Sequence, residues 1–241
     1  MTTFGKLASI QTKTTLREPA GAFFMLAFGP VFALLMGLIL NNGPEADYDG
    51  SLAGFAGIVV AITSFVLLPI DIVSQRDNGA LRRFRATPLR PLTYVAADLV
   101  MRFVLILFSL LAMLLVGMAV FGARPQGDFV AVLLATALGI LTFLAVGYAL
   151  TAVLPSQGAA QAVGNILVYP LIMLSGAAVP LAVMPDEVRQ LAQFSPLTQF
   201  VTLAEGIWAG ETWTGNWVAL LVLVATLGVA TVIAARFFRW E

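Results

Sequence analysis

Residues 75–91, QRDNGALRRFRATPLRP, hold five of the thirteen basic residues of this chain. Strongly apolar sequence flanks this stretch, over residues 52–70 on one side and 103–121 on the other. The chain of 241 residues is 60% hydrophobic and 11% charged, which is far less charge than a soluble domain of this size needs to cover its surface. The composition therefore indicates a membrane protein whose densest charge lies on one internal loop.

Six apolar runs reach the length that a membrane span requires, about 20 residues for a hydrocarbon core of about 30 Å. None alternates with period two, so a transmembrane β-barrel is disfavoured. The first run has no small-residue cleavage site after it and is expected to be a retained span, not a signal peptide. We predict an all-α polytopic membrane protein with spans over residues 22–40, 52–70, 103–121, 129–154, 162–183 and 217–235.

Lysine and arginine are distributed unequally between the two sides of this arrangement, and cytosolic loops carry the excess. Only Arg124 and Arg189 fall on the side opposite the arginine-rich loop. The first loop on that side, NNGPEADYDGS, has three acids and no base. We expect a multi-pass protein of the cytoplasmic (inner) membrane, with both termini and the arginine-rich loop in the cytosol.

The segment before the first span is amphipathic. On a helical wheel its bases Lys6, Lys13 and Arg17 lie opposite its apolar residues Phe4, Leu7 and Ala8. We predict an interfacial helix on the cytosolic side, with the basic face towards lipid head groups. A frayed polar tail is the alternative.

The arginine-rich loop has the pattern of a turn at Asn78–Gly79 followed by a short helix, which the prolines at 88 and 91 end. Leu81 and Phe84 would share one face of this helix. Two interpretations stay open from the residues alone. The loop could be an anchor that binds lipid phosphates, or a docking element for a cytosolic partner.

Two motifs in this six-span frame resemble the membrane subunit of ABC-2 type transporters, the exporter family that includes daunorubicin-resistance-type permeases. The first is QRDNGALRRFRATPL, after span two; the second is SGAAVPLAVMPDEVRQLAQFSPLTQFVTLAEGIWAGE, residues 175–211. The resemblance covers nearly the whole chain, and implies one transmembrane domain over residues 1–241. The chain departs from the family pattern at Gln75, where an acid is frequent, and at Glu205, where an arginine is frequent.

The resemblance implies that the arginine-rich loop is a coupling helix that docks into a groove of a cytosolic ABC ATPase subunit. The implied docking residues are Asp77, Gly79, Leu81, Arg82, Arg83, Phe84 and Arg85. The chain has no GxxxxGK[ST] phosphate loop, so ATP and Mg²⁺ would be bound by the partner, present in two copies. A second membrane subunit, identical or different, would complete the transporter.

Residues 184–216 have the pattern of two short helices. Ser195 and Pro196 suit the cap and first position of the second one. The pair resembles the re-entrant helices that narrow the outer gate in this family, which assigns the gate to Pro185, Leu191, Pro196 and Phe200. An interfacial loop without a gating role is the alternative.

Span five is interrupted by polar residues and a proline, which suits a substrate path or a subunit interface. We assign this role to Asn165, Tyr169, Pro170 and Ser175, and next to Phe28, Phe55 and Phe65 of spans one and two. Ordinary helix packing is the alternative at each position. Asp71, Asp98 and Arg102 are expected to be end-of-helix anchors, with Asp98 and Arg102 as an i,i+4 pair.

These features together favour a permease subunit of an ATP-driven exporter over an enzyme. A substrate path lined by residues with so little charge suits a hydrophobic or amphipathic cargo, such as a drug or a lipid-like molecule, as in multidrug or antibiotic resistance. The chain has no cysteine and no histidine, which limits nucleophilic, redox and acid–base chemistry. Its zero net charge argues against nucleic-acid binding. An ion-coupled carrier and an integral-membrane lipid enzyme are the alternatives.

Overall fold

The computed structural model describes residues 11–12, 15, 17, 19–40, 48–79, 91–179 and 181–237. Within these ranges the chain consists of helices, turns and short irregular connections, without a strand. Six helices are long and apolar enough to cross a membrane. The chain is thus an all-α, multi-pass membrane protein, and the predicted fold class is confirmed.

The spans are composed of the following elements. Span one consists of α2 (Pro19–Ala22), η1 (Phe23–Ala27) and α3 (Phe28–Leu40), and span two of α4 (Tyr48–Ile62), η2 (Thr63–Leu67) and α5 (Leu68–Asp77). Spans three to six are α7 (Pro91–Val120), α8 (Phe129–Thr151), α9 (Gln157–Leu174) and α12 (Trp217–Phe237). Between α9 and α12 lie η3 (Leu181–Val183), α10 (Asp186–Ala192) and α11 (Pro196–Trp208).

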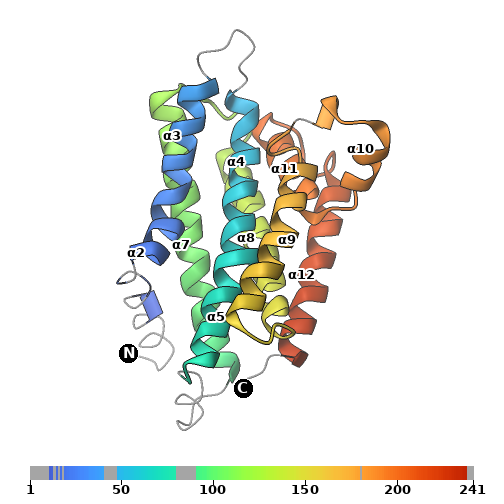
Figure 1. Ribbon diagram of the computed structural model, residues 1–241. Coiled ribbons are helices and arrows are strands. Elements are labelled where there is room, and N and C mark those ends of the chain that lie inside the picture. Colours follow the sequence, from blue (N-terminus) through green and yellow to red (C-terminus); the bar gives the residue numbers. More distant parts are fainter. Residues whose placement is uncertain are drawn as a thin grey trace.

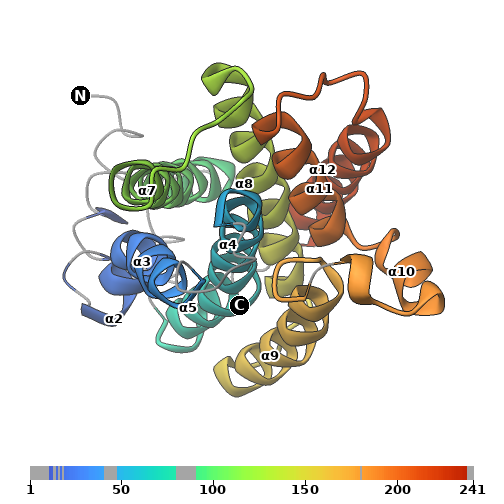
Figure 2. The same cartoon turned by 90° about the horizontal axis from the view of Figure 1, so that it is seen from above.

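The helices form one bundle in which α4 and α8 are central (Figure 1, Figure 2). Helices α3 and α7 cover one side, whereas α9, α11 and α12 cover the other (Figure 2). Span two is the most deeply buried of the six. Helices α10 and α11 lie at the end of the bundle where α4 begins (Figure 1), which is the outer side in the predicted topology.

Three spans differ from the prediction by more than three residues at one end or both. Span two continues to Asp77 and span three already begins at Pro91, because the polar residues at these helix ends find partners inside the bundle. Span five begins earlier than predicted, at Gln157, because the Ser156 hydroxyl caps it by accepting a hydrogen bond from the Ala159 N–H at 3.3 Å. It ends at Leu174, before Gly176 adopts a φ of +85°.

Spans one and two each contain a π-helical segment, η1 and η2, and each segment is followed within three residues by a proline, Pro30 or Pro69. Proline has no N–H, and its ring clashes with the carbonyl four residues earlier, which lies in the π-helical segment in both cases. The wider π turn relieves this clash. In η2 the Leu68 N–H donates to the carbonyl of Thr63, which closes the π turn.

Candidate functional site

The arginine-rich loop leaves the bundle at the end of α5. The Asn78 N–H donates to the Ser74 carbonyl at 2.9 Å, and the Gly79 N–H donates to the Arg76 carbonyl at 3.0 Å. Gly79 has a φ of +70°, which favours glycine, and it closes the predicted turn. Asp77 and Gly79 are described; the docking residues Leu81, Arg82, Arg83, Phe84 and Arg85 lie outside the described residues.

A group of polar side chains joins α5, α7 and α8 at this end of the bundle. The Arg102 Nε donates to Asp98 Oδ2 at 2.6 Å, and its Nη2 pairs with Asp71 Oδ2. The Tyr148 hydroxyl donates to the same oxygen of Asp98. The side chains of Arg102 and Asp98 are 1% and 2% exposed, whereas that of Asp71 is 37% exposed. The i,i+4 pair is confirmed, but the interpretation of Asp98 and Arg102 as end-of-helix anchors is wrong because both are buried among helices.

A second set of hydrogen bonds continues this network towards the loop. The Tyr94 hydroxyl donates to Gln75 Oε1 at 2.6 Å, and Gln75 Nε2 donates to Asp71 Oδ1 at 3.1 Å. Gln75 occupies the position where the family often has an acid. Its amide accepts from Tyr94 on α7 and donates to Asp71 on its own helix, and an ionised carboxylate could not make both of these contacts. The polar cluster, as we call this network, comprises Asp71, Gln75, Tyr94, Asp98, Arg102 and Tyr148.

The polar cluster fastens the two ends of the arginine-rich loop to each other. Asp71 and Gln75 lie on α5, where the chain leaves the bundle, and Tyr94 and Arg102 lie on α7, where it returns. A protein with a buried ion pair is often no more stable than one in which apolar residues replace both partners. Removal of one partner alone costs about 3–5 kcal/mol, because the other charge stays buried. The cluster therefore penalises any arrangement in which these helices slide apart.

The last turn of α5 also contacts the connection between α8 and α9. Arg76 Nη2 donates to the Leu154 carbonyl at 2.5 Å. Asp77 Oδ2 accepts a hydrogen bond from the Gln157 N–H, the first residue of α9, at 3.3 Å. The start of the arginine-rich loop is thus bound to the connection between spans four and five.

Two glycines bring α8 and α9 against the backbone of η2. A Cβ on Gly147 would lie 2.3 Å from the Ser64 carbonyl oxygen, and a Cβ on Gly164 would lie 2.5 Å from that of Phe65. The Phe65 carbonyl is the one that Pro69 deprives of its α-helical donor. Only glycine permits this approach, in which the Cα–H groups can face the carbonyls. Span two is therefore packed tightly against spans four and five at its π-helical segment.

The predicted substrate-path residues of span five have different surroundings. Tyr169 is 63% exposed, Pro170 is exposed and Asn165 is half-buried. Ser175 is buried, and its hydroxyl donates to the Ile172 carbonyl at 2.8 Å and accepts from the Ala177 N–H at 3.2 Å. Together with Gln161, Asn165 and Tyr169 form a polar stripe at i,i+4 spacing.

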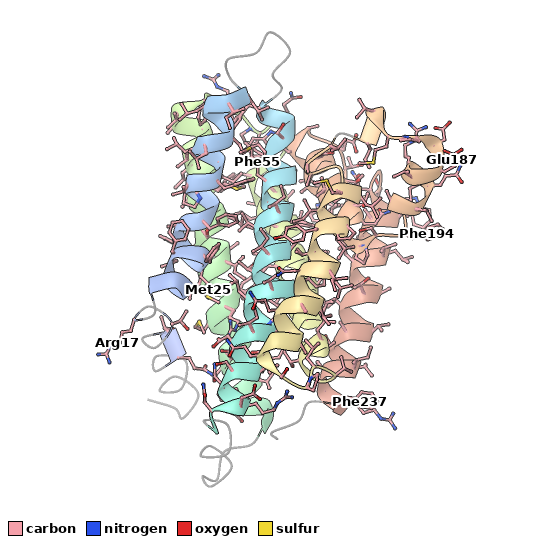
Figure 3. All side chains as sticks on the ribbon, in the orientation of Figure 1. Arg17, Met25, Phe55, Glu187, Phe194 and Phe237 are labelled. Atoms are coloured by element: carbon pink, nitrogen blue, oxygen red, sulfur yellow. The ribbon has the colours of Figure 1, made fainter. Side chains whose placement is uncertain are left out.

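The three phenylalanines assigned to the path lie mainly inside this chain. Phe55 (Figure 3) and Phe65 are buried in the core, and Phe28 is half-buried. The Phe65 ring contacts Phe143, whose ring lies 6.1 Å from that of Phe200 on α11. These rings connect η2 with α11.

Helices α10 and α11 lie within the predicted range 184–216, and α11 begins at the predicted Pro196. Pro185 precedes α10, and the Ser195 hydroxyl caps α11 by accepting from the Thr198 N–H at 3.4 Å, with Pro196 in the first turn. Phe200 is buried, whereas Leu191 is 67% exposed. Phe194 points away from the bundle (Figure 3).

Sequence reasoning missed the polar cluster as a unit. Asp71 and Arg102 are 31 residues apart, and no sequence period relates residues on opposite sides of a loop. The available signal was that Asp71, Asp98 and Arg102 lie at similar depth in spans two and three, where ionisable residues are expensive without partners. Within the described ranges no cluster of acids is suited to hold a metal ion.

Comparison with known proteins is consistent with this arrangement. The sequence model described as "ABC-2 family transporter protein" matches residues 35–236. The chain is 26% identical over 194 residues to the "Inner membrane transport permease YhhJ" of Escherichia coli, and 28% identical over 182 residues to the "Putative transport permease YvfS" of Bacillus subtilis. These alignments cover 78% and 75% of this chain. It is 20% identical over 190 residues, 78% of this chain, to the "Probable multidrug ABC transporter permease YbhS" of Escherichia coli. The alignments span about half of YhhJ (52%) and YbhS (49%), and 72% of YvfS.

Proposed function

Because this chain belongs to the ABC-2 family of transporter proteins, we propose that it is the membrane-spanning subunit of an ATP-driven exporter. A separate cytosolic ABC ATPase, in two copies, would bind ATP and Mg²⁺, and a second membrane subunit would complete the path. The cargo would be hydrophobic or amphipathic, a drug or a lipid-like molecule.

The observation that carries this proposal is the way the arginine-rich loop is mounted. Its two ends are joined through the polar cluster, and its first residues contact the connection between α8 and α9. A loop that serves only as a lipid anchor does not need such a rigid attachment to several spans. A loop that receives force does, because the force must reach several spans together. We therefore favour the docking role over the anchor.

Co-purification with an ATPase tests the docking role. We expect that Leu81→Asp combined with Phe84→Asp abolishes binding of the co-expressed ATPase subunit but leaves membrane insertion intact, because apolar contacts should carry more of the affinity than exposed ion pairs. The matched control is Leu191→Asp combined with Phe194→Asp, two exposed apolar positions on the predicted outer side. If both double variants retain the ATPase equally, the assignment of the loop is wrong.

The polar stripe of α9 supports a role of span five at the subunit interface or along the path. An amide or a phenol facing lipid leaves its hydrogen-bonding groups unpaired, at a cost of several kcal/mol per group. The stripe Gln161, Asn165 and Tyr169 should therefore face another subunit or water. The opposite side of α9, with Gly164 and Val168, is buried against this chain.

Cysteine cross-linking tests this interface, and the chain contains no cysteine of its own. In a homodimer, Tyr169→Cys should give a disulfide-linked dimer in membranes after mild oxidation. Leu221→Cys is the control, because Leu221 has a similar exposure (58%) but lies on the apolar face of α12. Equal cross-linking of both variants would contradict the interface.

We also propose that α10 and α11 form the outer gate. The proposal is supported by the contact of the Phe143 ring with the rings of Phe65 and Phe200, which links α11 to span two, the span that leads into the arginine-rich loop. Spin labels on Leu191→Cys in two copies should change their separation when the ATPase binds nucleotide. Labels on Val232→Cys serve as the control, and an unchanged separation at Leu191 would exclude gating.

An ion-coupled carrier remains a second candidate, and the polar cluster is the observation that favours it. Intramembrane acids often mark proton pathways. In this chain Arg102 already neutralises one of the two acids, and the cluster lies at one end of the spans. Transport driven by a pH gradient in vesicles without ATPase or ATP would favour the carrier over the exporter.

A further inference from the structure

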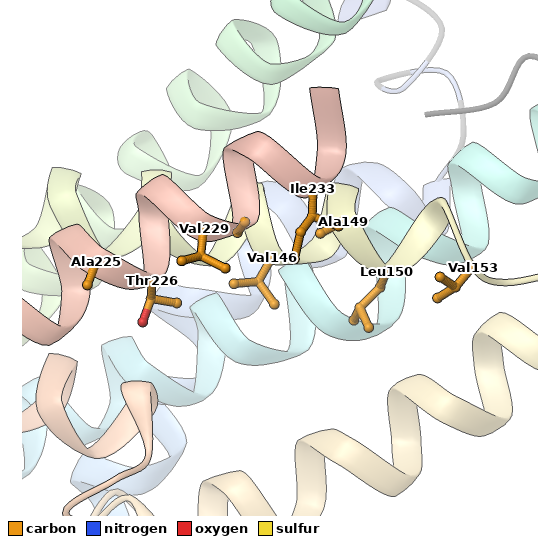
Figure 4. A pocket seen from close by; sticks show the side chains of 9 residues that line it. Val146, Ala149, Leu150, Val153, Ala225, Thr226, Val229 and Ile233 are labelled. Atoms are coloured by element: carbon orange, nitrogen blue, oxygen red, sulfur yellow. The ribbon is translucent and has the colours of Figure 1, made fainter. Parts of the chain in front are cut away.

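A groove with a volume of about 560 Å³ lies between α8 and α12 on the outside of the bundle (Figure 4). One wall is made by Val146, Ala149 and Leu150 of α8 with Val153 just after it, and the other by Ala225, Thr226, Val229, Ala230 and Ile233 of α12. Thr226 supplies the only hydroxyl group among these side chains. The groove is thus a long apolar depression without a charge.

The surface around the groove has the character of a lipid-facing surface. The large exposed side chains along α12 include Leu221, Val224, Val229, Val232 and Ile233, which are all aliphatic. This differs from the exposed side of α9, where the polar stripe lies. Aliphatic side chains lose nothing in contact with hydrocarbon, so this side of the bundle can stay in the bilayer.

The length of the groove matches one leaflet. From Ala225 to Ile233 a helix rises about 12 Å, and half of a hydrocarbon core is about 15 Å. The groove occupies the second half of α12, so it belongs to the leaflet on the side where α12 ends. It is as long as most of one acyl chain.

A cation lies at the end of the groove. Arg236 follows Ile233 by three positions and Val229 by seven, so it continues the same face of α12 just beyond the groove. Arg236 is exposed and has no ion-pair partner among the residues that the structure describes. On the other wall, the connection after Val153 reads Leu154, Pro155 and Ser156 and carries no charge. In the described part of the chain the guanidinium thus forms no ion pair.

We propose that the groove binds one acyl chain of an anionic phospholipid, whose phosphate pairs with Arg236. The groove supplies apolar contact along one leaflet, and Arg236 supplies a positive charge at the depth of the head group. This site is separate from the polar stripe of α9 and does not depend on an ATPase partner. It is a structural lipid site between spans four and six, not part of the cargo path.

Native mass spectrometry of the detergent-purified protein tests the site. The protein is mixed with phosphatidylglycerol or with phosphatidylcholine that has the same acyl chains, and the bound lipids are counted. We expect Val229→Trp, which fills the groove, to bind one phosphatidylglycerol fewer than the wild type. Val232→Trp is the matched control, because Val232 is equally exposed on the same helix (63% against 61%) but does not line the groove.

The charge is tested separately with Arg236→Gln. We expect this variant to lose about fivefold in its preference for phosphatidylglycerol over phosphatidylcholine, the effect of one arginine near an anionic surface. An unchanged preference, or equal lipid counts for the two tryptophan variants, would overturn the proposal. If Val229→Trp instead splits a dimer without changing the lipid count, a second copy covers the groove and the lipid site is wrong.

Discussion

Replacement of Arg102 by methionine should destabilise the protein far more than an arginine change at the surface. In the folded protein Arg102 contacts both Asp98 and Asp71 and is 1% exposed. Methionine has a similar length but no charge, so the Asp98 carboxylate, 2% exposed, would keep only the Tyr148 hydroxyl as a partner. Loss of one partner of a buried ion pair costs about 3–5 kcal/mol. We expect the free energy of unfolding to fall by that amount.

The control is Arg189→Met on α10. Arg189 also pairs with an acid in the same helix, Asp186, but these side chains are 45% and 74% exposed. Exposed pairs contribute about 0–1 kcal/mol, so this variant should unfold almost like the wild type. Both variants lose one arginine–aspartate pair within a helix; Arg102→Met also loses the pair with Asp71, and its two partners lie in a more buried environment.

The assay is reversible unfolding by denaturing detergent in mixed micelles, followed by tryptophan fluorescence. A combined Asp98→Asn and Arg102→Met variant should recover much of the lost stability, because it removes the buried charge together with its partner. If Arg102→Met and Arg189→Met differ by less than about 1 kcal/mol, the polar cluster does not hold the spans together.

Three further changes test the packing, the caps and the coupling. Gly147→Ala should destabilise the protein by about 1–3 kcal/mol, because the new Cβ would meet the Ser64 carbonyl. Gly228→Ala is the control: its Cβ would have open space, so this variant should be neutral or stabilise by up to about 1 kcal/mol, and thermal unfolding compares the two. Asp128 caps α8, since its Oδ1 accepts a hydrogen bond from the Val130 N–H at 3.1 Å. In the same assay Asp128→Ala should lower the stability by about 1 kcal/mol and Asp128→Asn should lower it almost not at all; equal losses would contradict capping. Arg76→Gln should keep ATPase co-purification but lower the amount of cargo moved per ATP hydrolysed, because the hydrogen bond from Arg76 to the Leu154 carbonyl, between α8 and α9, is lost. An unchanged ratio of cargo to ATP in proteoliposomes would refute this role.

Much of the fold follows from local properties that the sequence carries openly. Continuous apolar runs predict the six spans, and Ser195 followed by proline predicts the start of α11, because caps depend on neighbouring residues only. The polar cluster could not be predicted in this way. The contact of Tyr148 with Asp98 joins residues 50 positions apart, and it depends on how two helices are rotated against each other. That rotation is set by packing over the whole bundle, including the glycine contacts at η2.

The prolines at 30 and 69 illustrate a signal that was present but ambiguous. A proline in a span can produce a kink, a break or a π-helical segment, depending on what neighbouring helices offer to the freed carbonyl. For Pro69, the neighbours are Gly147 and Gly164, on two other spans. The outcome thus depends on three helices, although only one of them contains the proline.

The π-helical segment η2 also determines the direction in which the second half of span two, the α5 helix, faces. A π turn holds one residue more than an α turn, so each residue beyond it lags by about 100° around the helix axis relative to an uninterrupted α-helix. Asp71 and Gln75 lie after this offset and point at α7, whereas Phe55 and Val59 lie before it and point into the core. In a continuous α-helix, the first half could not face the core while the second half faces α7. The single π turn therefore lets one helix pack against partners that lie in two different directions.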